Sequence, residues 1–180
     1  MHGEDIRTRK AVIIGAGRVG SHVALCLMFQ HLVNEIVFLD VNKEAARAQA
    51  LDLDDLASGL GDSFTIRVGD YGSEFQDRHV KVRAGDYADC KDAHFVILTA
   101  GRSRRPGETR LQMLDGTIKV LDGIVGPLRD SGFHGILISV SNPADIVVEY
   151  LYRKMGLPRN QVFGTGTSLD SARLRRVLSE

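Results

Sequence analysis

Cysteine is scarce in this sequence, and neither sign of charge is in excess. The two cysteines, Cys26 and Cys90, have no CxxC spacing, which excludes a disulfide framework and indicates a reducing compartment. Each is expected to be a small buried apolar side chain, and no metal site is expected. Lysine plus arginine (23) equals aspartate plus glutamate (23). A nucleic-acid partner, which favours a basic surface, is therefore not expected.

Long apolar runs are also missing. The most apolar stretch, residues 23–33, is interrupted by Gln30 and His31, whereas a span of the bilayer needs roughly 20 apolar residues. The charged residues 1–10 lack the apolar core of a signal peptide. We therefore expect a cytoplasmic protein without a membrane partner.

Short apolar runs are present instead, and they alternate with helical patterns. Strands are expected at residues 11–14, 35–39, 79–83, 95–99 and 135–140. Several of these runs are apolar throughout, which is typical of a parallel sheet covered on both faces.

Helices are expected between these strands, over residues 18–31 and 43–57. A third helix has an apolar stripe at spacings of three and four: Leu111, Leu114, Ile118, Leu121, Val125 and Leu128. Gly126-Pro127 is expected to kink or end it. The repeated order of strand and helix predicts an α/β fold with a doubly wound parallel sheet.

A glycine-rich turn, GxGxxG at residues 15–20, follows the first expected strand and opens the first expected helix. Gly15 is expected to permit the tight turn, Gly17 to let the backbone approach a pyrophosphate, and Gly20 to let the helix pack closely on the strand. Asp40 ends the next strand, 20 residues after Gly20. This context indicates a dinucleotide-binding Rossmann domain.

The cofactor expected at this turn is NAD. A helix N-terminus offers free amides and partial positive charge to phosphates. The Asp40 carboxylate suits the ribose hydroxyls of adenosine and would repel a 2′-phosphate, which disfavours NADP. The expected cofactor-binding residues of this half of the sheet are Gly15, Gly17, Arg18, Val19, Gly20 and Asp40.

An arginine-rich loop follows the fourth expected strand, which ends at Thr99-Ala100-Gly101. Ligands of doubly wound sheets bind beyond the carboxyl ends of the strands, so Thr99, Ala100 and Gly101 are also expected to contact the cofactor. Four arginines lie within residues 102–110. Their position favours a mobile lid over an anion.

Four motifs together resemble the L-lactate/malate dehydrogenase family. They are GAGRVGS at 15–21 with Asp40, TAGRSRRPGETR at 99–110, SNPAD at 141–145 and GTGTSLDSAR at 164–173. The resemblance implies an NAD-binding Rossmann domain over residues 8–163. It also implies that residues 164–180 are only the beginning of a C-terminal substrate-binding domain, and that the full-length form is a homo-oligomer.

The resemblance implies roles for individual residues. Arg110 looks like the lid arginine that polarises the substrate carbonyl. Asn142 looks like the asparagine beside the nicotinamide, where it would contact both cofactor and substrate. Arg173 is similar to the arginine that holds the substrate carboxylate, for which a planar guanidinium is suited. Asp170 is similar to the acid that orients the catalytic histidine.

The substrate implied is a small L-2-hydroxy or 2-oxo acid, and two signals within the resemblance conflict. Arg104 occupies the position where malate dehydrogenases have arginine and lactate dehydrogenases usually have glutamine. GTGTSLD and the SGFHG stretch at 131–135 look more like lactate and branched 2-hydroxy-acid dehydrogenases. The lactate type ranks first because its agreement spans more residues, and malate is the alternative.

The catalytic histidine of the family lies in a Gly-Glu-His-Gly segment, which this sequence does not contain. Histidine suits the proton transfer because its pKa is near neutral. Of the six histidines, only His22 is expected near the cofactor. We therefore expect the chain to be the cofactor half of a dehydrogenase, truncated or fragmentary.

Two other classes stay open from the sequence. The NAD-dependent glycosidases look distantly similar in their cofactor domain, but Cys26 and Cys90 are badly placed for the metal that they need. A non-enzymatic NAD-binding module would also lack the histidine segment.

Overall fold

A computed structural model of the chain describes residues 9–61, 80–101, 107–109 and 112–179. For residues 60 and 61 it describes the backbone only. Within the described residues, six parallel strands form one sheet in the order β3-β2-β1-β4-β5-β6. The strands are β1 (Lys10–Ile14), β2 (Glu35–Leu39), β3 (Lys81–Ala84), β4 (Phe95–Leu98), β5 (Ile136–Ser139) and β6 (Val162–Gly164). The doubly wound parallel sheet expected from the sequence is confirmed.

The strand order reverses direction at β1. The chain builds outward from β1 through β2 to β3, then returns to place β4 on the other side of β1, with Val12 opposite both Val37 and Val96. In open α/β sheets, ligands bind in the crevice at such a switch point, beyond the carboxyl ends of the strands. The fold therefore predicts a ligand site at the carboxyl ends of β1 and β4.

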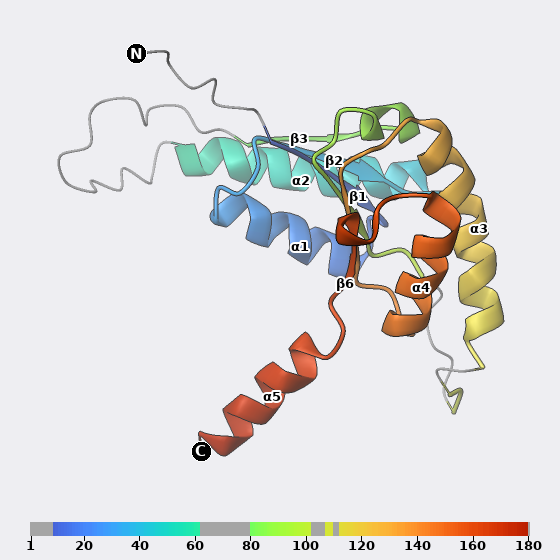
Figure 1. Cartoon of the computed structure of the whole chain (residues 1–180). Helices are drawn as coiled ribbons and strands as arrows, with labels where there is room; N and C mark the ends of the chain where they lie inside the picture. The colour runs from blue at the N-terminus through green and yellow to red at the C-terminus, as the bar shows by residue number, and fades with distance from the viewer. Residues whose placement is uncertain (1–8, 62–79, 102–106, 110–111, 180) are drawn as a thin grey trace, which may run out of the picture.

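Helices cover both faces of the sheet (Figure 1). On one face lie α1 (Arg18–Phe29) and α2 (Lys43–Gly61); on the other lie α3 (Leu114–Asp130), α4 (Ala144–Met155) and the short 3-10 helix η1 (Tyr87–Cys90). In α2 the buried residues recur at spacings of four, three and four: Ala46, Ala50, Leu53 and Ala57. This is the apolar stripe that holds a helix against a sheet.

Some elements differ from the expected ones. The helix α3 does not end at Pro127 but continues to Asp130. Pro127 cannot donate to the carbonyl of Gly123, but both residues are exposed, so water can satisfy that carbonyl. The helix α4, the 3-10 helix η2 (Arg159–Gln161) and the strand β6 were not expected from the sequence.

The two cysteines differ in burial. Cys90, the last residue of η1, is buried as expected, whereas Cys26 is exposed, so the prediction was wrong for Cys26. Ala24 and Met28 face the sheet from α1. Because Cys26 lies midway between them, the helical repeat turns it towards solvent.

The helix α5 (Ser168–Leu178) extends away from the rest of the chain (Figure 1). The structure describes every residue of α5, and none of them is buried. The side chains of Leu174, Val177 and Leu178 are each more than half exposed. The helix therefore has no packing partner within the described residues. No helix in the described ranges is long and apolar enough to cross a membrane.

Candidate functional site

The glycine turn joins β1 to α1 at the switch point. Gly15 has φ of +112°, and a Cβ there would lie 2.7 Å from the amide nitrogen of Ala100. At Gly20 a Cβ would lie 2.0 Å from the carbonyl oxygen of Gly15. The tight turn and the close helix packing expected of these two glycines are thus both present.

Gly17 differs from its neighbours because the space beside it is open. A Cβ at Gly17 would meet no atom within 4 Å, and Gly17 itself is exposed. The first amides of α1 have no acceptor within the helix, and the exposed Arg18 and Val19 stand in that first turn. An anion can therefore approach the backbone here, which fits the diphosphate of a dinucleotide.

Asp40 follows β2 and holds the glycine turn. Its Oδ2 accepts a hydrogen bond from the amide of Ala16 at 2.8 Å, and its Oδ1 accepts one from the amide of Asn42, also at 2.8 Å. A carboxylate has about four acceptor positions, so each oxygen can still accept a bond from a ribose hydroxyl. The geometry suits a ribose with free hydroxyls.

The end of β4 lies against the same turn. The amides of Thr99 and Ala100 both donate to the carbonyl of Ile14 at 2.9 Å. The Thr99 hydroxyl donates to the carbonyl of Gly15, also at 2.9 Å. Thr99 and Ala100 are partly buried, and Gly101 is exposed beyond them. The structure thus brings the residues expected from β1 and β4 together.

The end of β5 adds Ser141 and Asn142. The buried Ser141 donates its hydroxyl to the carbonyl of Ala100 at 2.6 Å, and Asn142 is exposed beside it, before a cis peptide bond to Pro143. Sequence reasoning missed Ser141 as a site residue, although it begins the SNPAD motif. Its contact with Ala100 depends on β4 and β5 being neighbours.

The pair on α5 lies apart from these strand ends. Arg173 donates from Nη1 to Oδ1 of Asp170 at 3.2 Å, and the side chains are 64% and 67% exposed. The two residues are three positions apart, so their side chains project from the same face of α5. The structure does not bring Asp170 or Arg173 to Asn142, because α5 extends away from the sheet (Figure 1).

The arginine loop is only partly described. Arg104 and Arg110, the two arginines assigned to the substrate, lie outside the described residues. Where the loop rejoins α3, the amide of Thr109 donates to the side chain of Gln112 at 2.7 Å, and Thr109 Oγ1 accepts from the amide of Gln112 at 3.3 Å. These reciprocal bonds join Thr109 to Gln112, just before α3.

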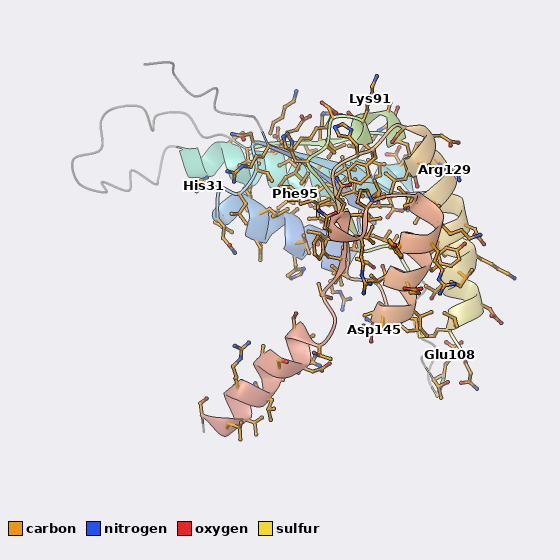
Figure 2. The ribbon with its side chains drawn as sticks, in the orientation of Figure 1. His31, Lys91, Phe95, Glu108, Arg129 and Asp145 are labelled. Atoms are coloured by element: carbon orange, nitrogen blue, oxygen red, sulfur yellow. The ribbon has the colours of Figure 1, made fainter. Side chains whose placement is uncertain are left out.

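Side chains at the two ends of the sheet can be followed in Figure 2. Asp145 in the first turn of α4 and Glu108 of the arginine loop lie at one end, whereas Lys91 and Arg129 lie at the other. Of the four histidines that the structure describes, His22 lies at the start of the second turn of α1, with Nδ1 2.6 Å from the Arg18 carbonyl. The others are at the amino ends of strands or the end of α1, as expected: His31, His94 and His134.

The groups with shifted pKa values gather mainly at the amino end of the sheet. Five charged residues, here called the amino-edge cluster, are Lys10, Glu35, Arg83, Asp89 and Asp92. The Arg83 guanidinium bonds both Asp89 and Glu35, and its hydrogen bonds lower the pKa of Asp89 to about 2. A surface pocket is lined in part by this cluster and has both basic and acidic side chains in its walls. None of the residues expected to bind the cofactor lies there.

Comparison with known proteins places these features among dehydrogenases. The sequence model described as the lactate/malate dehydrogenase NAD binding domain matches residues 9–164. L-lactate dehydrogenase 1 of Bifidobacterium longum subsp. longum is 43% identical over 171 residues, which are 95% of this chain and 49% of the relative. L-lactate dehydrogenase 3 of Bacillus anthracis is 43% identical over 173 residues, which are 96% of this chain and 50% of the relative.

Solved structures agree. The minor L-lactate dehydrogenase from Enterococcus mundtii in its ligands-bound form has a TM-score of 0.81 and 38% identity, covering 96% of this chain and 50% of its own. Malate dehydrogenase from Archaeoglobus fulgidus in complex with NADH has a TM-score of 0.80 and 31% identity, covering 94% and 53%. The chain spans about half the length of the curated relatives that it matches.

Proposed function

Because the chain belongs to the lactate/malate dehydrogenase family through its NAD-binding domain, we propose that it supplies the cofactor half of an L-2-hydroxy-acid dehydrogenase of the L-lactate type. The match confirms the family inferred from the four sequence motifs, and it confirms NAD as the cofactor. NAD, when bound, supplies the acceptor or donor of the hydride. The residues of this chain bind and orient it.

One observation carries the proposal: the ends of β2, β1, β4 and β5 meet in hydrogen-bonded contact at one edge of the sheet. The glycine turn would bind the diphosphate and Asp40 the adenosine ribose. Thr99, Ala100, Gly101 and Asn142 would then lie along the nicotinamide half.

Substrate roles extend beyond this edge. Arg110 would polarise the substrate carbonyl, with Asn142 beside it, and Arg173 would bind the substrate carboxylate. Asp170 would orient a histidine that this sequence does not contain. These roles need α5 to approach the sheet edge, and we propose that residues 164–180 form part of a second domain after a cofactor domain at 8–163.

The lactate type is supported by the names of the relatives, since those at 43% identity are L-lactate dehydrogenases. Arg104 favours malate as the alternative, because a guanidinium there would pair with a second carboxylate. We propose a cytoplasmic homo-oligomer acting on small 2-hydroxy or 2-oxo acids. The balanced charge supports the absence of a nucleic-acid partner.

Titration of the 180-residue chain tests the proposal. We expect saturable quenching or enhancement of NADH fluorescence, weaker binding of NADPH because of Asp40, and no oxidation of NADH with pyruvate or oxaloacetate. The absence of saturable NADH binding would contradict the cofactor half. Turnover by this chain alone would contradict the need for a Gly-Glu-His-Gly histidine.

Substrate choice needs a chimera with the C-terminal half of the Bifidobacterium longum relative. For the lactate type, we expect a higher kcat/KM for pyruvate than for oxaloacetate. Arg104→Gln in the same chimera tests the alternative: a large loss with oxaloacetate alone would show that Arg104 recognises a second carboxylate.

A further inference from the structure

Three side chains link the carboxyl ends of four neighbouring strands in sequence across the sheet. Asp40 after β2 bonds the amide of Ala16 after β1, and Thr99 after β4 bonds the carbonyl of Gly15. Ser141 after β5 completes the series by bonding the carbonyl of Ala100. Each link joins a side chain of one strand end to the backbone of the next.

The last of these links, from Ser141 to Ala100, is a hydrogen bond made by a buried serine. Its side chain belongs to a residue only 6% exposed, and its hydroxyl lies 2.6 Å from the Ala100 carbonyl and 3.4 Å from that of Leu98. The amide of Ala100 is bonded in turn to Ile14 of β1 at 2.9 Å. The backbone of Ala100 is therefore held at its amide by Ile14 of β1 and at its carbonyl by Ser141, which follows β5.

We propose that Ser141 is a positioning residue for the nicotinamide end of the cofactor, an inference that rests on the proposed function. It does not itself touch the reacting atoms. By fixing its own backbone to Ala100, it fixes the adjacent Asn142 relative to Gly101, which follows Ala100. A Cβ at Gly101 would lie 4.0 Å from the Ser141 hydroxyl, so the two loops are in direct proximity.

The position of Ser141 limits its effect to one half of the dinucleotide. A dinucleotide lies across the switch point, with one mononucleotide on each side of it. Asp40 and the glycine turn serve the β2–β1 side, whereas Ser141 joins only β4 and β5. Loss of its hydroxyl should therefore loosen the nicotinamide side and leave the adenosine side in place.

Ser139 provides a matched control two residues earlier. It is fully buried at the end of β5, but its hydroxyl has no hydrogen-bond partner among the described residues. Ser139→Ala also removes the hydroxyl of a buried serine, at the end of β5, without removing a link. Any general cost of shortening a buried serine at this place appears in both variants.

The test compares NADH with ADP-ribose, which lacks the nicotinamide, by calorimetric titration of the 180-residue chain. We expect Ser141→Ala to raise the Kd for NADH about three- to tenfold, the loss of about one hydrogen bond. Its Kd for ADP-ribose should change less than about twofold, and Ser139→Ala should change neither. Equal weakening of both ligands, or no change in NADH binding, would overturn the positioning role.

Amide hydrogen exchange in the ligand-free chain separates this inference from the proposed function. The amides of Ala100 and Val140 are bonded across β1–β4 and β4–β5, to Ile14 and Leu98. Ser141→Ala should accelerate their exchange severalfold, and Ser139→Ala should not. If the unaltered chain binds neither ligand, the proposed function fails and exchange alone decides the link. Unchanged exchange in Ser141→Ala overturns the link itself.

Discussion

The two ends of this sheet are held together in different ways. At the carboxyl end, single side chains of Asp40, Thr99 and Ser141 bond backbone groups of neighbouring loops. At the amino end, the amino-edge cluster joins β1, β2, β3 and η1 by ion pairs. Lys10 anchors this cluster, with its Nζ 2.7 Å from Asp92 and a side chain only 9% exposed.

The difference follows from what each end has to leave free. An anion at the carboxyl end needs unpaired amides and weak competition from other charges. Two of the three links there are neutral hydroxyls, and the one carboxylate is held by backbone amides. The ion pairs that stabilise the sheet lie at its amino end, where their charges do not compete with the amides for a bound phosphate.

Among these variants, Gly20→Ala should lower the free energy of unfolding most, because its new methyl group clashes with backbone at the carboxyl end of the sheet. The new Cβ would lie 2.0 Å from the carbonyl of Gly15 and 3.0 Å from the Thr99 hydroxyl. Since the nearest atom is backbone, we expect a loss of about 3 kcal/mol in the free energy of unfolding. Urea denaturation measures this.

Gly17→Ala is the matched control, since its Cβ would meet no atom within 4 Å. It should unfold like the unaltered chain and still lose NADH affinity, because the methyl group occupies the approach to the turn. A stable Gly20→Ala variant, or a Gly17→Ala variant that binds NADH normally, would contradict this account of the turn.

Asp89→Asn breaks the amino end instead. It removes the carboxylate that Arg83 and Lys10 share, and the Asp89 side chain is only 18% exposed. We expect a loss of about 2 kcal/mol in unfolding free energy, as for hydrogen bonds to charged groups. The Kd for NADH should not change. Equal effects on stability and NADH binding would show that the two ends are coupled.

Asp92→Asn serves as its control in the same denaturation series. Asp92 also pairs with Lys10, but its side chain is 74% exposed. Exposed pairs contribute less than about 1 kcal/mol, so this variant should lie between the unaltered chain and Asp89→Asn.

Acid should weaken the amino end in a defined range. The Arg83 hydrogen bond lowers the pKa of Asp89 to about 2 from an ordinary value of 3.8. A lowered pKa in the folded state stabilises the fold above pH 4, and that stability is lost as the pH falls from about 4 to about 2. Over this pH range, the free energy of unfolding of the unaltered chain should fall by about 1 to 2 kcal/mol more than that of Asp89→Asn. Urea denaturation at several pH values measures the difference.

Thiol labelling should show the smallest effect. Burial raises the pKa of Cys90 to about 12, whereas Cys26 is exposed on α1. A disulfide reagent at pH 8 should label one thiol per chain rapidly and the second only after unfolding. Asp89→Asn should speed the second reaction severalfold because η1 loses its bond to Arg83. Gly17→Ala should leave that rate unchanged.

Local sequence patterns predict much of the fold, and for β6 and α4, which they fail to predict, the reasons are local. The strands β1, β2, β4 and β5 were found because continuous apolar runs are typical of buried parallel strands. The strand β6 was missed because Val162–Gly164 is too short to show a period. In α4, the neighbouring Ile146, Val147 and Val148 favour a strand by propensity, but packing of Val147 and Leu151 on the sheet decides for helix.

The site was accessible only where its residues are neighbours in sequence. The glycine turn and its spacing to Asp40 could be read directly. The Ser141 link depends on strand order, because Ser141 and Ala100 are 41 residues apart. The approach of Asp170 and Arg173 to Asn142 stays a prediction, since α5 has no buried residue.

The central place of β1 also bears on how the chain folds. β1 is the first strand that the structure describes, yet Ala11 to Ile14 pair with Phe95 to Leu98, more than 80 residues later. Pairings over such separations carry a large loop-closure entropy and slow the folding of parallel sheets. During synthesis, β1 with β2 and β3 must wait, with one apolar edge unpaired, until β4 has emerged. A chaperone that shields that edge would therefore act before the switch point exists.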